Sequence, residues 1–121
     1  MALWLPNRPE FLWYWLAASQ IGLVAVLLNT RLKRDEAAYQ LAQSESRAVI
    51  VPGAGAFRDF IGDLIGMRDE IPKLAHILAL DPVERPFAGV TDWSGRLAEV
   101  LPQPRHAEDP DATVLIAYSS G

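Results

Sequence analysis

The stretch Asp111-Ala-Thr-Val-Leu-Ile-Ala-Tyr-Ser-Ser-Gly121 indicates both the fold class and the kind of ligand to expect. Its apolar run, Val114 to Tyr118, predicts a buried strand, and two serines and a glycine follow at once. Serine hydroxyls and nearby backbone N–H groups can reach anionic oxygens, and glycine has no Cβ to obstruct them. We therefore predict that Ser119, Ser120 and Gly121 begin a phosphate-binding loop, although serine and glycine also favour ordinary turns.

Further apolar runs of strand length alternate with helical patterns along the rest of the chain. The expected strands are Ala2 to Leu5, Val24 to Leu28, Arg47 to Val51 and Leu74 to Leu80, separated by helices over about 9–21, 34–43 and 57–67. Uniformly apolar strands that alternate with helices are typical of a parallel sheet covered on both faces. The sequence thus predicts one α/β subdomain over residues 1–121, a three-layer α/β/α fold with a mainly parallel sheet of about five strands.

Several local features of these elements can be predicted as well. Asn7 is expected to cap the first helix, and Thr91 to cap a further helix over Asp92 to Val100. The first helix is apolar nearly all round, which predicts cover on most of its sides. The third helix is expected to bury Phe57 and Ile65 among other apolar residues. Residues 81–90 and 102–110 are expected to be loops because they are rich in proline and polar residues.

Four segments together resemble a known family. They are Leu3-Trp-Leu-Pro-Asn-Arg-Pro-Glu-Phe11, Gly22-Leu-Val-Ala-Val-Leu-Leu-Asn-Thr-Arg31, Glu36-Ala-Ala-Tyr-Gln-Leu41 with Ser46-Arg-Ala-Val-Ile-Val51, and Tyr118-Ser-Ser-Gly121. In order and spacing they are similar to segments of the adenylate-forming acyl-CoA synthetases, the AMP-binding ligases. The resemblance covers about residues 2–51 and 109–121. It departs at both ends, since members usually have a few tens of residues before the position of Met1, and the lysine of the phosphate loop lies beyond Gly121.

The resemblance implies that the chain is the N-terminal portion of an ATP-dependent acid–CoA (or acid–thiol) ligase. Such enzymes activate a carboxylate as acyl-AMP and pass the acyl group to a thiol, usually coenzyme A. It implies ATP, Mg²⁺ and coenzyme A for the parent enzyme, with none bound to this chain alone. Ser119, Ser120 and Gly121 would be a partial site for the ATP phosphates, and no catalytic or metal-binding residue is assigned. The expected partners are the remainder of the parent chain and the carboxylic acid substrate.

The same residues leave other readings open. A chain truncated at the start of its phosphate loop is expected to be inactive by itself, and apolar surface left uncovered would favour self-association. A non-catalytic, flavodoxin-like binding or interaction module is the alternative to a ligase. The uncharged run Phe11 to Leu28 is also long enough to raise the alternative of a membrane anchor. We expect instead a helix, a turn at Gly22 and a strand, because glycine often ends a helix.

Composition narrows the partners and the compartment. The formal net charge is −4, from 11 basic and 15 acidic residues, which argues against a nucleic-acid partner because such proteins present a basic face. The chain has no cysteine, so disulfides, thiolate metal sites and a cysteine nucleophile are excluded. A cytoplasmic location agrees with this composition.

The remaining candidate sites have ordinary structural explanations. Gly53-Ala54-Gly55 lies between a predicted strand and a helix, as a dinucleotide loop does, but the third glycine of that motif is missing and we predict a turn. His76 and His106 lie far apart in the sequence and carry no metal-ligand spacing. Asn29 and Arg31 are expected to form a structural turn. The carboxylates of Glu108, Asp109 and Asp111 are expected to be solvated.

Overall fold

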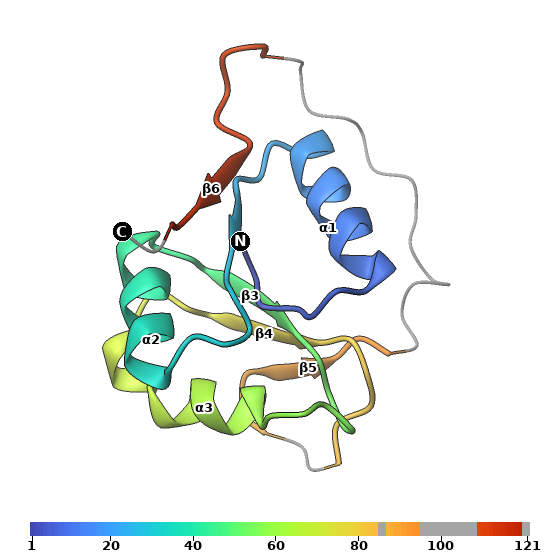
Figure 1. Cartoon of the computed structure of the whole chain (residues 1–121), viewed down its shortest axis with the longest axis vertical. Helices are drawn as coiled ribbons and strands as arrows, with labels where there is room; N and C mark the ends of the chain where they lie inside the picture. The colour runs from blue at the N-terminus through green and yellow to red at the C-terminus, as the bar shows by residue number, and fades with distance from the viewer. Residues whose placement is uncertain (85–86, 95–108, 120–121) are drawn as a thin grey trace.

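The computed structural model describes residues 1–84, 87–94 and 109–119, which form a single parallel sheet with helices on both faces (Figure 1). In chain order, the described elements are β1 (Ala2–Leu3), α1 (Pro9–Gln20), β2 (Ala25–Leu27), α2 (Arg34–Gln43), β3 (Ala48–Val51), α3 (Phe60–Gly66), the 3-10 turn η1 (Arg68–Glu70), β4 (His76–Ala79), β5 (Val90–Asp92) and β6 (Leu115–Ala117). The predicted three-layer α/β/α class is confirmed. The sheet has six strands instead of about five.

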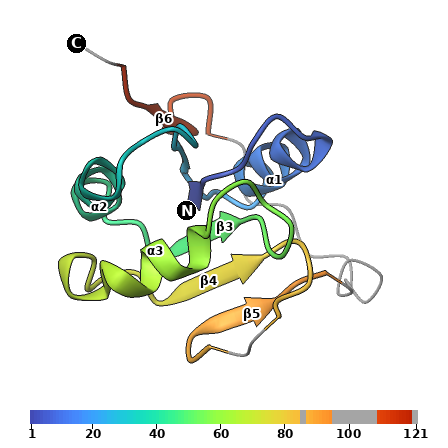
Figure 2. The same ribbon diagram turned by 60° about the horizontal axis from the view of Figure 1, so that its bottom comes forward.

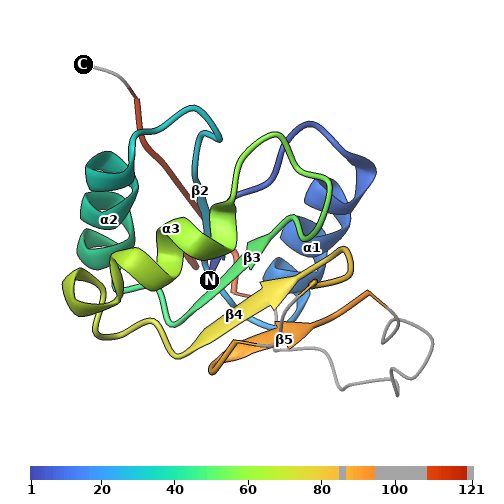
Figure 3. The same cartoon turned by 90° about the horizontal axis from the view of Figure 1, so that it is seen from below.

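The strand order is β5-β4-β3-β1-β2-β6, and every neighbouring pair is parallel. From β1 the chain crosses to β2 on one side, and from β2 it crosses back over β1 to β3 and on to β4. Right-handed crossovers therefore require α1 to lie on one face of the sheet and α2 and α3 on the other. The structure has this arrangement, with β5 at the outer edge beside β4 (Figure 2) and α1 opposite α2 and α3 (Figure 3).

The core divides between the two faces because side chains alternate along each strand. Trp4, Val49 and Val51 belong to the larger cluster, which packs under α2 and α3. Leu3 and Ile50, one residue out of step, belong to the smaller cluster that packs under α1. Burial of the strands on both faces explains why their sequences are apolar without alternation.

The run Phe11 to Leu28 forms a helix, a turn and a strand, as predicted. Helix α1 ends at Gln20, Gly22 adopts a left-handed backbone with φ of 73°, and β2 begins at Ala25. Glycine tolerates this φ because it has no Cβ. Within residues 1–84, 87–94 and 109–119, no helix combines the length and the hydropathy needed to cross a bilayer.

The start of α1 differs from the prediction. The N-cap is Arg8 and not Asn7, its backbone is extended, and no side chain caps the first turn. Pro9 occupies the first helical position, where its fixed φ suits the helix and its missing N–H leaves no donor to cap. The Arg8 side chain instead pairs with Glu10 and with Asp81, which follows strand β4, as described below.

The helix α3 and the strand β5 correct two further expectations. Helix α3 begins at Phe60, because the Asp59 carboxylate accepts the backbone N–H of Gly62 at 2.8 Å and caps it. Phe57 lies before the helix and is 69% exposed, and Ile65 is 37% exposed, so neither is buried as expected. Thr91 lies within β5, where it pairs with Leu78, and does not cap a helix. Most of the helix expected over 92–100 and of the connector 102–110 lies outside the described residues.

The cover expected for α1 is also incomplete. Leu12, Trp13 and Leu16 are 53%, 59% and 55% exposed, while only Ala18 of this helix is buried. The inward face of α1 packs on the sheet through Phe11, Tyr14 and Trp15. The described residues therefore leave a broad apolar face of α1 open.

Candidate functional site

The carboxyl ends of β2 and β6 bring Ser119, the first residue of the predicted phosphate loop, beside the turn that follows β2. The two strands are parallel neighbours, with Val26 opposite Ile116 and Leu27 opposite Ala117. The chain leaves β6 through Tyr118 to Ser119, which is exposed. This is the edge at which ligands bind in open parallel sheets. Ser120 and Gly121 lie outside the described residues, so a phosphate contact by the three residues stays a prediction.

Tyr118 lines two hollows at this edge. The first, of about 710 Å³, is lined by Leu27, Asn29, Leu32, Asp35, Glu36, Tyr39, Gln40, Tyr118 and Ser119. The second, of about 720 Å³, is lined by Leu5, Pro6, Asn7, Phe11, Leu27, Leu28, Asn29, Thr30, Arg31, Ala117 and Tyr118. The tyrosine is half-buried against the larger core, and its hydroxyl donates to the Gln40 carbonyl at 3.4 Å.

The segment Asn29–Leu32 forms a wall of both hollows. Its backbone turns tightly: the Arg31 N–H donates to Asn29 Oδ1 at 2.9 Å, and the Leu32 N–H donates to the Asn29 carbonyl at 3.1 Å. Asparagine favours this local bond, so the predicted structural turn is confirmed. We call this segment the β2 turn.

The two hollows differ in charge. Asp35 and Glu36 line the first hollow, whereas Arg31 is the charged residue among those that line the second. The Arg31 side chain is exposed, and no ion pair joins it to another residue in the described part of the chain. An unpaired guanidinium can accept an anion through paired N–H donors. Arg31 thus lies in the predicted structural turn, four residues after the end of β2.

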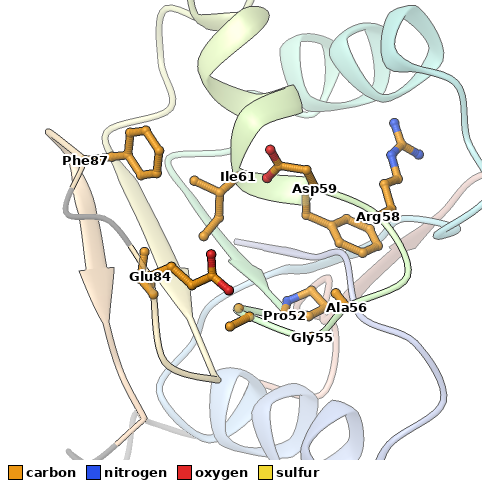
Figure 4. A pocket seen from close by; sticks show the side chains of 12 residues that line it. Pro52, Gly55, Ala56, Arg58, Asp59, Ile61, Glu84 and Phe87 are labelled. Atoms are coloured by element: carbon orange, nitrogen blue, oxygen red, sulfur yellow. The ribbon is translucent and has the colours of Figure 1, made fainter.

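A third hollow, of about 390 Å³, lies at the carboxyl end of β3 (Figure 4). The Gly53–Gly55 segment forms its floor and is a turn, as predicted. Asp59 and Glu84 contribute carboxylates to the lining, and the backbone N–H of Gly62 is already satisfied by Asp59. Arg58 also lines the hollow, but its guanidinium donates to the Asp63 carboxylate and to the carbonyls of Thr30 and Leu32. The remaining charged lining groups are carboxylates, which do not suit a phosphate of the same charge.

An arginine bridge joins the ends of β1 and β4 at the same edge. Arg8 donates to Asp81 Oδ2 at 2.8 Å and to Glu10 Oε1 at 2.8 Å, and Asp81 also accepts the Gly53 N–H at 3.2 Å. Hydrogen bonding from Arg8 lowers the pKa of Glu10 from its usual 4.5 to about 2 and lowers the pKa of Asp81. Charge-assisted bonds of this kind hold the strand ends together more strongly than neutral ones.

The bridge makes the stability of the protein depend on pH. Since the pKa of Glu10 is lower in the folded state, its contribution is fully present above pH 4.5 and is lost as the pH falls toward 2. The Glu10→Gln variant should therefore lose less stability than the wild type between pH 6 and pH 3, by about 1 kcal/mol for this partly exposed pair. Urea unfolding at both pH values measures this difference. Asp69→Asn is the matched control, and equal pH dependence of the wild type and Glu10→Gln would contradict the prediction.

The other titratable candidates do not come together as a site among the described residues. His76 is exposed on β4, Asp109 and Asp111 are exposed ahead of β6, and His106 and Glu108 lie outside the described residues. No group of three His, Cys, Asp or Glu side chains in the described part of the chain could hold a metal ion.

The comparison with protein families identifies the family of this chain. The family model described as "AMP-binding enzyme" matches residues 1–121, which is the whole chain. The chain belongs to the AMP-binding enzyme family. The resemblance seen in four segments is thus confirmed over the full length, including the stretch between residues 51 and 109 that carried no clear signal.

Named relatives place the chain within the AMP-binding family. It is 33% identical over 129 residues to the long-chain-fatty-acid–CoA ligase FadD13 of Mycobacterium tuberculosis (strain ATCC 25618 / H37Rv), covering 100% of this chain and 22% of that protein. It is 31% identical over 124 residues to a crotonobetaine/carnitine–CoA ligase of Escherichia coli, covering 100% of this chain and 23% of that protein. The chain therefore spans about a fifth of the length of these relatives.

A solved structure confirms the fold of this member of the AMP-binding family. The anthranilate CoA ligase AuaEII, solved with anthranoyl-AMP, superposes with a TM-score of 0.80 over 99% of this chain and 22% of that chain. The sequence identity is 23%, so this likeness bears on the fold alone.

Proposed function

We propose that this chain forms the N-terminal portion of an ATP-dependent acid–thiol ligase. The observation that carries the proposal is the match of the whole chain to the AMP-binding family, joined to an exposed serine after β6 at the carboxyl edge. The relatives named above are CoA ligases, which supports coenzyme A as the thiol and a carboxylic acid as the other substrate.

The chemistry that we propose divides into two balanced steps. A carboxylate oxygen attacks the α-phosphorus of ATP, forming acyl-AMP and releasing pyrophosphate. The thiol sulfur then attacks the acyl carbon, the C–O bond to AMP breaks, and the thiol proton passes to solvent. Ser119, Ser120 and Gly121 would hold phosphate oxygens during the first step, in which donors aimed at developing charge lower the barrier.

Mg²⁺ accompanies ATP in this proposal, but the described residues do not form a metal site of their own. Mg²⁺ prefers oxygen ligands and commonly binds through substrate phosphates with one or two carboxylates. No described group of three His, Cys, Asp or Glu side chains could supply such a site. We assign the metal to no residue of this chain.

Exchange of labelled pyrophosphate into ATP tests the proposal. The longer protein that contains this chain should catalyse exchange only when a suitable carboxylic acid is present, and residues 1–121 alone should show none. Replacement of Ser120 by alanine in the longer protein should lower kcat/KM for ATP by about tenfold, since a bond to a charged group is lost. Exchange that needs no acid, or an unchanged kcat/KM in Ser120→Ala, would contradict the proposal. Ser94→Ala, at the end of β5, is the control.

The exposed apolar face of α1 suits contact with two partners, the remainder of the longer protein and a second copy of this chain. We propose that the remainder of the longer protein covers Leu12, Trp13 and Leu16, and that residues 1–121 produced alone self-associate through them. Sedimentation of residues 1–121 at high concentration should show dimers or larger species, and Leu16→Ser should reduce them. A monomer at all concentrations would count against the self-association.

The location that we propose is cytoplasmic. The proposed reaction consumes a free thiol, and thiols stay reduced in that compartment. We propose no nucleic-acid partner. Fractionation of cells that express the longer protein would test the location.

A further inference from the structure

The residue Arg58 lies behind the β2 turn and is held by contacts from three elements. Its guanidinium stacks 4.8 Å from the centroid of the Trp4 ring and 5.7 Å from that of Phe60. Its Nε donates to the Asp63 carboxylate, and its side chain is 21% exposed. Arg58 is among the residues that line the hollow at Gly53–Gly55, and in Figure 4 its guanidinium points away from Glu84.

The remaining donors of Arg58 reach the backbone of the β2 turn. Nη1 donates to the carbonyl of Leu32 and, at 3.4 Å, to the carbonyl of Thr30. Trp4, which is fully buried, donates its Nε1–H to the carbonyl of Asn29 at 3.0 Å. Three of the four carbonyls of the turn thus accept hydrogen bonds from Trp4 or Arg58, neither of which lines the two hollows beside Tyr118.

Among the described residues, no other long-range hydrogen bond reaches the turn, and Leu32 adds packing against the larger core. The turn's own bonds are the short-range ones from Arg31 and Leu32 to Asn29. Such local bonds fix the shape of the turn but do not fix its position relative to Tyr118. The contacts from Arg58 and Trp4 cross 25 to 28 positions of sequence and set that position.

We propose that Arg58 is a positioning residue that fixes the β2 turn as the shared wall of the two hollows beside Tyr118. The inference rests on the proposed function in one respect, that a substrate of the ligase occupies these hollows. Among the described residues that line the second hollow, Arg58 forms a hydrogen bond only with Thr30, through its carbonyl. It acts on the ligand through the backbone of residues 29–32.

Arginine suits this role better than lysine. Its planar fork can stack on Trp4 while its edge donates to two carbonyls and one carboxylate, and it keeps its charge. Asp63 balances that charge in a half-buried site. A lysine could meet the carboxylate or one carbonyl but could not also stack as a plane.

Kinetics of the longer protein test the proposal. The variants are Arg58→Gln, Arg58→Lys and the control Arg47→Gln, whose exposed side chain lies at the amino end of β3, away from the hollows. In Arg58→Gln the KM of ATP, of the acid or of the thiol should rise by about tenfold, as coupling through a positioned element allows. The kcat should fall by less than about threefold. Arg58→Lys should recover part of the loss, and Arg47→Gln should match the wild type.

A purely structural role predicts the opposite pattern. The melting temperature and the specific activity of Arg58→Gln would fall while all three KM values stayed unchanged, and this result would overturn the proposal. If Arg58→Gln does not fold, the KM values of Arg58→Lys decide in the same way.

Amide hydrogen exchange separates this inference from the proposed function. In the same longer protein, the Leu32 amide should exchange about tenfold faster in Arg58→Gln than in Arg47→Gln, because the turn loses its anchor. Equal exchange in the two variants would overturn the positioning role even if the wild type is an active ligase. A wild type without pyrophosphate exchange would overturn the proposed function and leave the exchange measurement to decide on Arg58.

Discussion

Replacing Trp4 by alanine is expected to lower the free energy of unfolding by about 4 kcal/mol, as truncation of a buried tryptophan commonly does. The side chain is 0% exposed and meets Phe60 edge to face, with ring centroids 5.0 Å apart. The loss also removes one of the two donors to the Asn29 carbonyl and the nearer of the two aromatic rings beside Arg58. Since small domains are stable by only about 5–15 kcal/mol, much of the variant should be unfolded or insoluble.

Two variants give this prediction its controls. Trp13, in α1, is 59% exposed, so Trp13→Ala should change stability by no more than about 0.5 kcal/mol. Trp4→Phe keeps an aromatic ring but loses the indole N–H, and its loss should lie between the other two. Urea unfolding followed by circular dichroism ranks the three. A Trp4→Ala protein as stable as Trp13→Ala would contradict the packing described here.

Replacing Gly53 by alanine is the second change with a large expected effect. A Cβ at this position would lie 2.1 Å from the Asp81 carbonyl oxygen and 2.8 Å from that of Pro82. Both are backbone atoms, so the strand ends of β3 and β4 would have to separate. The Arg8 bridge and the bond from the Gly53 N–H to Asp81 would be strained with them. We expect a loss of about 3 kcal/mol, at the upper end for overpacking.

Gly66 offers a matched control on the same protein. A Cβ there would meet only Arg34 Nε at 3.7 Å, which is ordinary contact. Gly66→Ala, in the last position of α3, should be neutral or should stabilise the protein by up to about 1 kcal/mol, because alanine restricts the unfolded chain. Thermal melting of both variants makes the comparison. If Gly53→Ala and Gly66→Ala had the same melting temperature, the ends of β3 and β4 would not approach as closely as described.

The parts of the fold that could be predicted are those set by local pattern. Helix α2 occupies Arg34–Gln43 as predicted, because Ala37, Ala38 and Leu41 repeat at helical spacing and are buried together. Strands β3 and β4 lie within the apolar runs that predicted them. The strand β5 was missed because Val90–Asp92 is short, half polar and lies at the sheet edge, so its sequence carries no apolar run.

The parts that could not be predicted depend on contacts distant in sequence. The apolar pattern around α1 predicts that its side chains are buried, but it does not identify the segment that covers them. Leu12, Trp13 and Leu16 are exposed in the described structure. Phe57 follows the helical spacing of α3, yet Asp59 caps the helix after it and leaves the ring outside. The role of Arg58 has no signal in its own segment, since its partners are Trp4 and the β2 turn. The predicted Ser119 position agrees with the parallel pairing of β6 on β2, whereas its phosphate contact stays a prediction.

The most direct test of the central claim follows one oxygen atom. The longer protein is given ATP, coenzyme A and a carboxylic acid labelled with ¹⁸O in both carboxyl oxygens. If the acid is activated as acyl-AMP, one labelled oxygen leaves the acid with the phosphoryl group, and mass spectrometry should find a single ¹⁸O in the AMP formed. Formation of ADP with the label in inorganic phosphate, or AMP without label, would contradict an adenylate-forming ligase.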